Sequence, residues 1–206
     1  MQDDVRMQQT RTEDRTRLAT IISEVFAPAV LVSVFLLLTS FQASAWPEGL
    51  VYALIAVGFT TALPLAGVLA LVRRGHVTDH HISNRGQRAP VLAGALMSIT
   101  LGLVLLVALG APWEVVGGVL CTVGGIVAVL VVNLFWKLSA HSAVSVFLVF
   151  GAVALLGAWA SVLVLIPAAV GWSRVRLRAH TRAQVAAGYL VGAVIGAIFA
   201  GFVAGG

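Results

Sequence analysis

Residues 113–136 read WEVVGGVLCTVGGIVAVLVVNLFW, and their only charged side chain is that of Glu114. About 20 consecutive apolar residues are enough for an α-helix to cross the hydrocarbon core of a bilayer. The stretch therefore predicts a membrane-spanning helix. The whole chain has the same character, since 60% of its 206 residues are hydrophobic and 10% are charged, whereas soluble domains carry about 25% charged residues.

Similar apolar runs recur on both sides of this stretch, separated by polar or turn-forming residues. The seven expected segments are roughly residues 18–41, 49–72, 90–110, 113–136, 142–156, 158–171 and 184–204. The fifth and sixth are short, so one long tilted helix over 142–171 is the alternative, which would place residues 141 and 173 on opposite sides. We expect an all-α fold: a polytopic membrane helical bundle of six to seven transmembrane helices (residues 18–206) after a polar N-terminal tail (residues 1–17).

The basic residues gather on one side of this expected bundle. With seven spans, that side holds the N-terminal tail and the loops 73–90, 136–142 and 172–183. All 13 Lys and Arg residues and all five His residues lie in these four regions. Basic loops are retained in the cytoplasm, so we expect a multi-pass protein of the cell membrane with this polar face on the cytoplasmic side.

The last polar loop has the most specific pattern. Residues 173–188 read SRVRLRAHTRAQVAAG, which places Arg174, His180 and Gln184 at fixed intervals. Arg presents a planar fork that binds two phosphate oxygens. A His imidazole is a usable nucleophile near neutral pH when an acceptor holds its other ring nitrogen. The pattern fits phosphoryl transfer, and a basic loop that only binds anionic headgroups is the alternative.

This loop resembles the third signature of the type 2 phosphatidic acid phosphatase superfamily, which also includes the vanadium haloperoxidases. The resemblance implies that Arg174 grips phosphate and that His180 attacks phosphorus to form a phosphohistidine. Gln184 stands where the family has an Asp that orients the nucleophilic His. Its amide oxygen can accept the same hydrogen bond, but it supplies no negative charge to stabilise an imidazolium.

Residues 138–141, Leu-Ser-Ala-His, resemble the family's second signature, Pro-Ser-Gly-His, without its Pro and its Gly. The resemblance implies that Ser139 binds phosphate and that His141 protonates the leaving oxygen. The family fills the gap between its second and third signatures with two short helices. This favours two spans over one within residues 142–171.

The family's first signature, Lys followed by six residues and Arg-Pro, has a looser match in loop 73–90. Counting back from Arg88 places His81 at the Lys position, and Arg85 lies three residues before Arg88, on the same helix face. Lys137, four residues before His141, is a substitute for the missing Lys. The resemblance thus implies a phosphate-binding role for Arg85, Arg88, Lys137 and His81 beside Arg174 and Ser139.

Two other interpretations of loop 73–90 remain open. Imidazole and carboxylate groups suit several divalent metals, although the neighbouring arginines would repel a cation. The candidate ligands are His76, Asp79, His80 and His81. Alternatively, the loop only obeys the positive-inside rule.

The expected function is hydrolysis of a membrane lipid phosphate or diphosphate of the phosphatidate, phosphatidylglycerophosphate or polyprenyl phosphate type, with no metal or other cofactor. The expected partners are that lipid and the bilayer, and no nucleic acid. A non-catalytic lipid-phosphate-binding or transport protein on the same scaffold is the alternative. A homo-oligomer stays open, because Gly188, Gly192 and Gly196 permit close helix packing either within the chain or between two copies.

Overall fold

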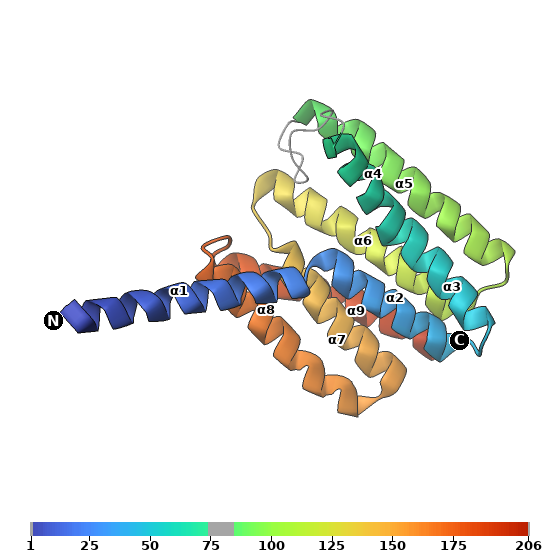
Figure 1. The fold of residues 1–206 in the computed structure, drawn as a ribbon. Coiled ribbons are helices and arrows are strands. Elements are labelled where there is room, and N and C mark those ends of the chain that lie inside the picture. Colours follow the sequence, from blue (N-terminus) through green and yellow to red (C-terminus); the bar gives the residue numbers. More distant parts are fainter. Residues whose placement is uncertain (1, 74–84, 206) are drawn as a thin grey trace. The chain divides into compact units, whose positions relative to one another are not determined.

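The computed structural model describes residues 2–73 and 85–205, with side chains from 14–73 and 93–205, and this part of the chain contains helices and turns but no strand (Figure 1). The expected all-α class is therefore confirmed. In chain order the elements are α1 (Gln2–Val25), α2 (Pro28–Ala43), α3 (Glu48–Val57), the π-helical turn η1 (Gly58–Ala62), α4 (Leu63–Arg73), α5 (Arg85–Ala108), α6 (Trp113–Phe135), α7 (Ala140–Leu156), the 3-10 helix η2 (Ala158–Val164), α8 (Leu165–Arg176) and α9 (Arg182–Gly205).

Several of these helices are long and apolar enough to cross a membrane. Within the described residues there are four: Glu48–Arg73, Trp113–Phe135, Ala158–Arg176 and Arg182–Gly205. A fifth arises if α1 and α2 are one span, bent by 43°. The bend falls where Pro28 begins α2, because Pro has no N–H to donate and its ring clashes with the preceding turn. Two further apolar helices, Ala93–Ala108 and Ala140–Leu156, are shorter. This is the helix content of a membrane protein.

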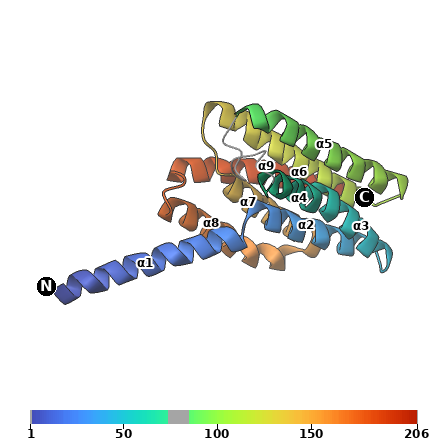
Figure 2. The same ribbon diagram turned by 45° about the horizontal axis from the view of Figure 1, so that its top comes forward.

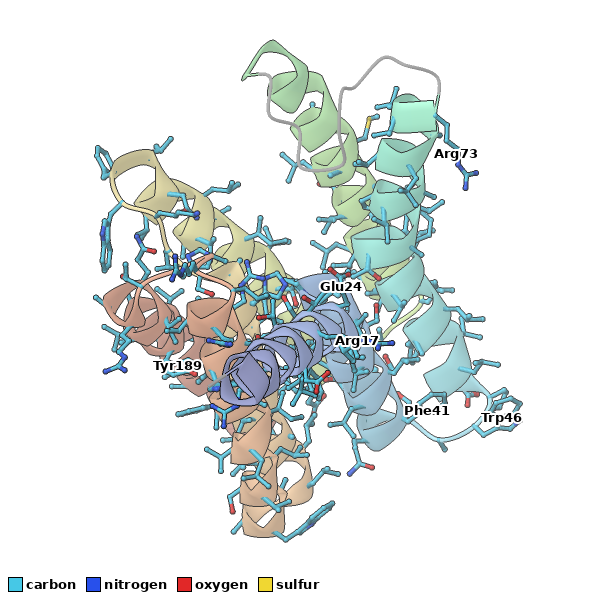
Figure 3. The ribbon with its side chains drawn as sticks, turned by 60° about the vertical axis from the view of Figure 1, so that its left-hand side comes forward. Arg17, Glu24, Phe41, Trp46, Arg73 and Tyr189 are labelled. Atoms are coloured by element: carbon cyan, nitrogen blue, oxygen red, sulfur yellow. The ribbon has the colours of Figure 1, made fainter. Side chains whose placement is uncertain are left out.

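The chain divides into two compact units, one made of the residues up to 31 with 121–205 and the other of residues 32–120. In the second unit, hydrogen bonds join α3 and η1 to the segment around α5. The Tyr52 hydroxyl donates to the Leu109 carbonyl (3.2 Å) and the Ser98 hydroxyl donates to the Phe59 carbonyl in the π turn (2.8 Å). Trp46 and Arg73 lie at opposite ends of this unit (Figure 3).

In the first unit, α9 packs closely along α7 (Figure 2). Three glycines on α9 make this possible. A Cβ at Gly188 would lie 2.6 Å from the Ser139 carbonyl oxygen, and a Cβ at Gly192 or Gly196 would collide with Ala143 or Phe150 of α7. The glycine face is therefore used for packing inside the chain, which is one of the two interpretations that the sequence left open.

The segment from residue 142 to residue 171 forms two helices rather than one. α7 ends at Gly157, whose φ of +91° is strained for any residue with a Cβ. The chain turns there, and η2 and α8 return beside α7 (Figure 1). In addition, the Ser139 N–H donates to the Gln184 carbonyl oxygen at 3.4 Å. The starts of α7 and α9 therefore lie at the same end of this unit.

Candidate phosphate-binding site

Six of the nine residues predicted for the site lie at this one end of the first unit. Arg174 is in the last turn of α8, His180 is in the α8–α9 turn, and Gln184 is in the first turn of α9. Lys137, Ser139 and His141 lie at or just before the start of α7. Of the other three, Arg85 and Arg88 are in the first turn of α5, in the second unit, and His81 lies outside the described residues.

The turn between α8 and α9 folds His180 back onto Arg174. Arg178 adopts a left-handed conformation, with φ of 52°, and this reverses the chain after the helix ends. As a result, the carbonyl oxygen of Arg174 accepts hydrogen bonds from the N–H groups of both Ala179 (3.1 Å) and His180 (3.3 Å). The residues between Arg174 and His180 thus consist of the end of α8 and the tight turn that follows it.

A capping box begins α9 directly after His180. The Thr181 hydroxyl oxygen accepts from the Gln184 N–H (3.3 Å), and the Gln184 side-chain oxygen accepts from the Thr181 N–H (3.1 Å). A Thr at the cap with a Gln three residues later is a recognised helix-start pattern. Gln184 also forms a side-chain hydrogen bond with His180. Gln184 therefore holds the start of α9 and also interacts with His180, which precedes the capping residue Thr181.

Ser139 caps α7 at the same end. Its hydroxyl oxygen accepts from the Ser142 N–H (3.3 Å) and from the Ser142 hydroxyl (2.9 Å), and its side chain is fully buried. These contacts hold the start of α7, where His141 is the second residue of the helix and is half-buried. Phosphate binding by the Ser139 hydroxyl stays a prediction.

Arg174 has partners on α1 that the sequence did not reveal. One of its terminal nitrogens, Nη1, donates to the Ser23 hydroxyl at 2.6 Å, and the Nε atom is buried without a hydrogen-bond partner in the described part of the chain. The next residue on α1, Glu24, interacts electrostatically with the guanidinium (Figure 3 labels Glu24 on this helix). Ser23 lies 151 positions before Arg174, and no local pattern links two residues so far apart.

The surroundings of His180 favour a neutral imidazole. Burial lowers the pKa of this side chain below its ordinary value of 6.5, and the positive charges of Arg174 and Lys137 lower it further. The hydrogen bond with Gln184 acts in the opposite direction. Its Nδ1 atom is buried and finds no hydrogen-bond partner among the described residues, so the contact with Gln184 does not satisfy this nitrogen.

The positive charge at this end is opposed by Glu24 of α1, which interacts with Arg174, but by no acidic residue of the three helices that build the end. The last acidic residue in the sequence is Glu114, so no carboxylate lies on α7, α8 or α9. These elements, the loops between them and the segment just before α7 carry five Lys and Arg residues: Lys137, Arg174, Arg176, Arg178 and Arg182. The N-termini of α7 and α9, where the helix dipole is positive, point to the same end. The arrangement is suited to binding an anion such as phosphate.

The part of the chain that the structure describes offers no site for a metal ion. The described residues contain no group of three or more His, Cys, Asp or Glu side chains that could hold a metal ion. The four candidate ligands of loop 73–90 lie outside the described residues.

No protein-family model, curated protein or solved structure matches the chain. Function is therefore argued from the site itself.

Proposed function

We propose that this protein hydrolyses a phosphate ester or diphosphate of a membrane lipid and that it is a divergent relative of the type 2 phosphatidic acid phosphatases. In this proposal six or seven of its helices cross the cell membrane, and the site opens to the cytoplasm. The observation that carries the proposal is the pairing of His180 with Arg174. The backbone N–H of His180 donates to the Arg174 carbonyl oxygen, burial and neighbouring positive charges lower the pKa of the imidazole, and α7, α8 and α9 carry no acidic residue.

The residues have distinct parts in the proposed reaction. Arg174 and Lys137 hold the phosphoryl oxygens, and their charge stabilises the charge spread over the transferring group. An imidazole nitrogen of His180 bonds to phosphorus as the bond from phosphorus to the lipid oxygen breaks, and His141 gives that oxygen a proton. Water then attacks the phosphohistidine, the P–N bond breaks, and inorganic phosphate leaves.

Two of the remaining residues act through these four. Gln184 orients the imidazole, and Ser139 fixes the helix start that carries His141. Arg85, Arg88 and His81 are expected to add contacts to the phosphate or diphosphate group.

A second candidate function is lipid-phosphate binding without turnover. The observation that favours it concerns Gln184. Its side-chain oxygen is already engaged by the Thr181 N–H, and the side chain carries no charge. An imidazolium formed during attack would then lack the carboxylate that the phosphatase family supplies.

Phosphate release separates the two functions. The purified protein in detergent, with EDTA present, is given phosphatidate, phosphatidylglycerophosphate and a prenyl diphosphate in turn. The enzyme proposal expects release that survives EDTA and falls at least about 100-fold in His180→Ala, since covalent catalysis depends on this side chain. Arg178→Gln, a change at an exposed position of the same turn, is the matched control and is expected to stay within about twofold.

Each outcome assigns one of the two functions. Equal release by the wild type and His180→Ala removes the enzyme proposal. Binding of the same lipids that is lost in Arg174→Gln, without any release by the wild type, establishes the binding function instead.

A further inference from the structure

A cavity of about 450 Å³ lies between α8 and α9, next to the candidate site but built from other residues. It is lined chiefly by Trp172, Val175, Arg176, Arg182, Val185 and Tyr189. None of these is a residue of the proposed phosphatase reaction. Ligand pockets in proteins commonly have volumes of about 300–1,000 Å³, so the cavity is large enough for part of a lipid molecule.

The cavity has a cationic end and an apolar end. Arg176 is the last residue of α8 and Arg182 is the first residue of α9, so both lie where these helices leave the apolar region. Val185 and Tyr189 lie three and seven residues further along α9, and with a rise of about 1.5 Å per residue the apolar wall extends about 10 Å from Arg182. No acidic side chain lines the cavity.

The apolar end is held open by a fixed aromatic ring. The Tyr189 hydroxyl donates to the Pro167 carbonyl at 2.5 Å, and it lies where a Cβ on residue 171 would be, so only the glycine found there leaves it space. Tyr189 comes from α9 and reaches α8 (Figure 3). The side chains of Trp172 and Ala186 at the cavity are exposed, so the cavity is open at the surface of the two helices.

We propose that this cavity binds one anionic phospholipid of the bilayer. Its phosphate lies between Arg176 and Arg182, and the first carbons of an acyl chain lie against Val175, Val185 and Tyr189. Charge complementarity supports a phosphate, because two arginines and no carboxylate line that end of the cavity. The apolar wall supports a lipid rather than a free phosphate ion, which would leave that wall exposed to water. The proposal is independent of catalysis, since it requires no reaction at His180.

Native mass spectrometry of the full chain, released from detergent micelles that contain phosphatidylglycerol, tests the proposal. The double variant Arg176→Gln/Arg182→Gln removes the charge, and Ala186→Trp fills the apolar end while it keeps the charge. Arg178→Gln, which removes an arginine of the same turn outside the cavity lining, is the control. We expect half-occupancy by one phosphatidylglycerol to need about tenfold more lipid in both cavity variants, and an unchanged value in the control.

Two competition measurements identify the ligand. Phosphatidylcholine and inorganic phosphate, each added as a competitor beside phosphatidylglycerol, are both expected to leave the phosphatidylglycerol occupancy unchanged. Displacement by inorganic phosphate would show a free-anion site and overturn the proposal. It is also overturned if both cavity variants retain the lipid as the wild type does, or if Arg178→Gln weakens retention as much as they do. Should the double variant not fold, Ala186→Trp alone decides between these outcomes.

Discussion

The backbone N–H of His180 donates a hydrogen bond to the carbonyl oxygen of Arg174 at 3.3 Å, across the turn that ends α8. This bond places the imidazole and the guanidinium of the candidate site on one short, hydrogen-bonded piece of backbone. It depends on the left-handed conformation of Arg178 and on the capping box that follows it. The relative position of the two residues along the backbone is therefore set by local hydrogen bonds.

The charge missing at Gln184 is expected to limit the reaction. Gln184→Glu keeps the length of the side chain and the capping box, and it adds a negative charge beside His180 that stabilises the imidazolium. We expect phosphate release to rise about tenfold or more. Ala183→Glu, which adds the same charge at the neighbouring exposed position, is the control. Unchanged release in Gln184→Glu, with folding intact, would show that Gln184 serves only the helix start.

The pH dependence of phosphate release is expected to report the lowered pKa of His180. Protonation removes the nucleophile, so the rate falls as the pH drops through this pKa. Because burial and the charges of Arg174 and Lys137 lower the pKa below 6.5, the midpoint of the acid limb of kcat/KM is expected below pH 6.5. Lys137→Gln removes one of these charges and moves the midpoint up. A midpoint above 6.5 in the wild type, or a downward shift in Lys137→Gln, would contradict this assignment.

The Ser23 hydroxyl is expected to compete with phosphate for Arg174, since it accepts from Nη1 at 2.6 Å. Ser23→Ala removes this competitor. We expect inorganic phosphate to bind about three- to tenfold more tightly, in line with the loss of one hydrogen bond, as measured by isothermal titration calorimetry. Thr20→Ala, on the same helix, breaks only a bond to the Thr16 carbonyl and serves as the control. Weaker phosphate binding in Ser23→Ala would instead make Ser23 part of the phosphate site.

The packing of α9 on α7 is expected to tolerate no side chain at Gly192. A Cβ there collides with the Ala143 carbonyl group, so Gly192→Ala is expected to lower the free energy of unfolding by about 1–3 kcal/mol. Gly201→Ala, on the same helix with open space around it, is expected to be neutral or slightly stabilising. Thermal unfolding in detergent compares the two. Equal effects would show that the close approach of the helices is not required.

The sequence predicted most of the helices because their signal is local. An apolar run of sufficient length is itself the reason for a membrane helix, and the break at Gly157 was visible as a glycine between two such runs. Pro28, however, begins a new helix within the apolar run 18–41, where the two helices are bent by 43°, and the polar segment before residue 18 is helical. Composition does not decide whether a proline ends a helix or bends it.

The candidate site was predictable only in part. The spacing of Arg174, His180 and Gln184 is a local pattern, and the structure shows the turn that produces it. The contact of Arg174 with Ser23 and the cavity lined by Arg176 and Arg182 depend on which helix faces meet. A single sequence does not specify those faces when most residues on them are Val, Leu or Ala.

The three glycines that let α9 pack against α7 also affect the candidate site at the start of these two helices. His141 begins one of these helices, and His180 directly precedes the other. With two backbones in contact over several turns, the two helix starts are not free to spread apart or to draw together. The distance between His141 and His180 is thus set by the packing of the two helices, and under the proposed function these two residues are in position before a lipid phosphate binds.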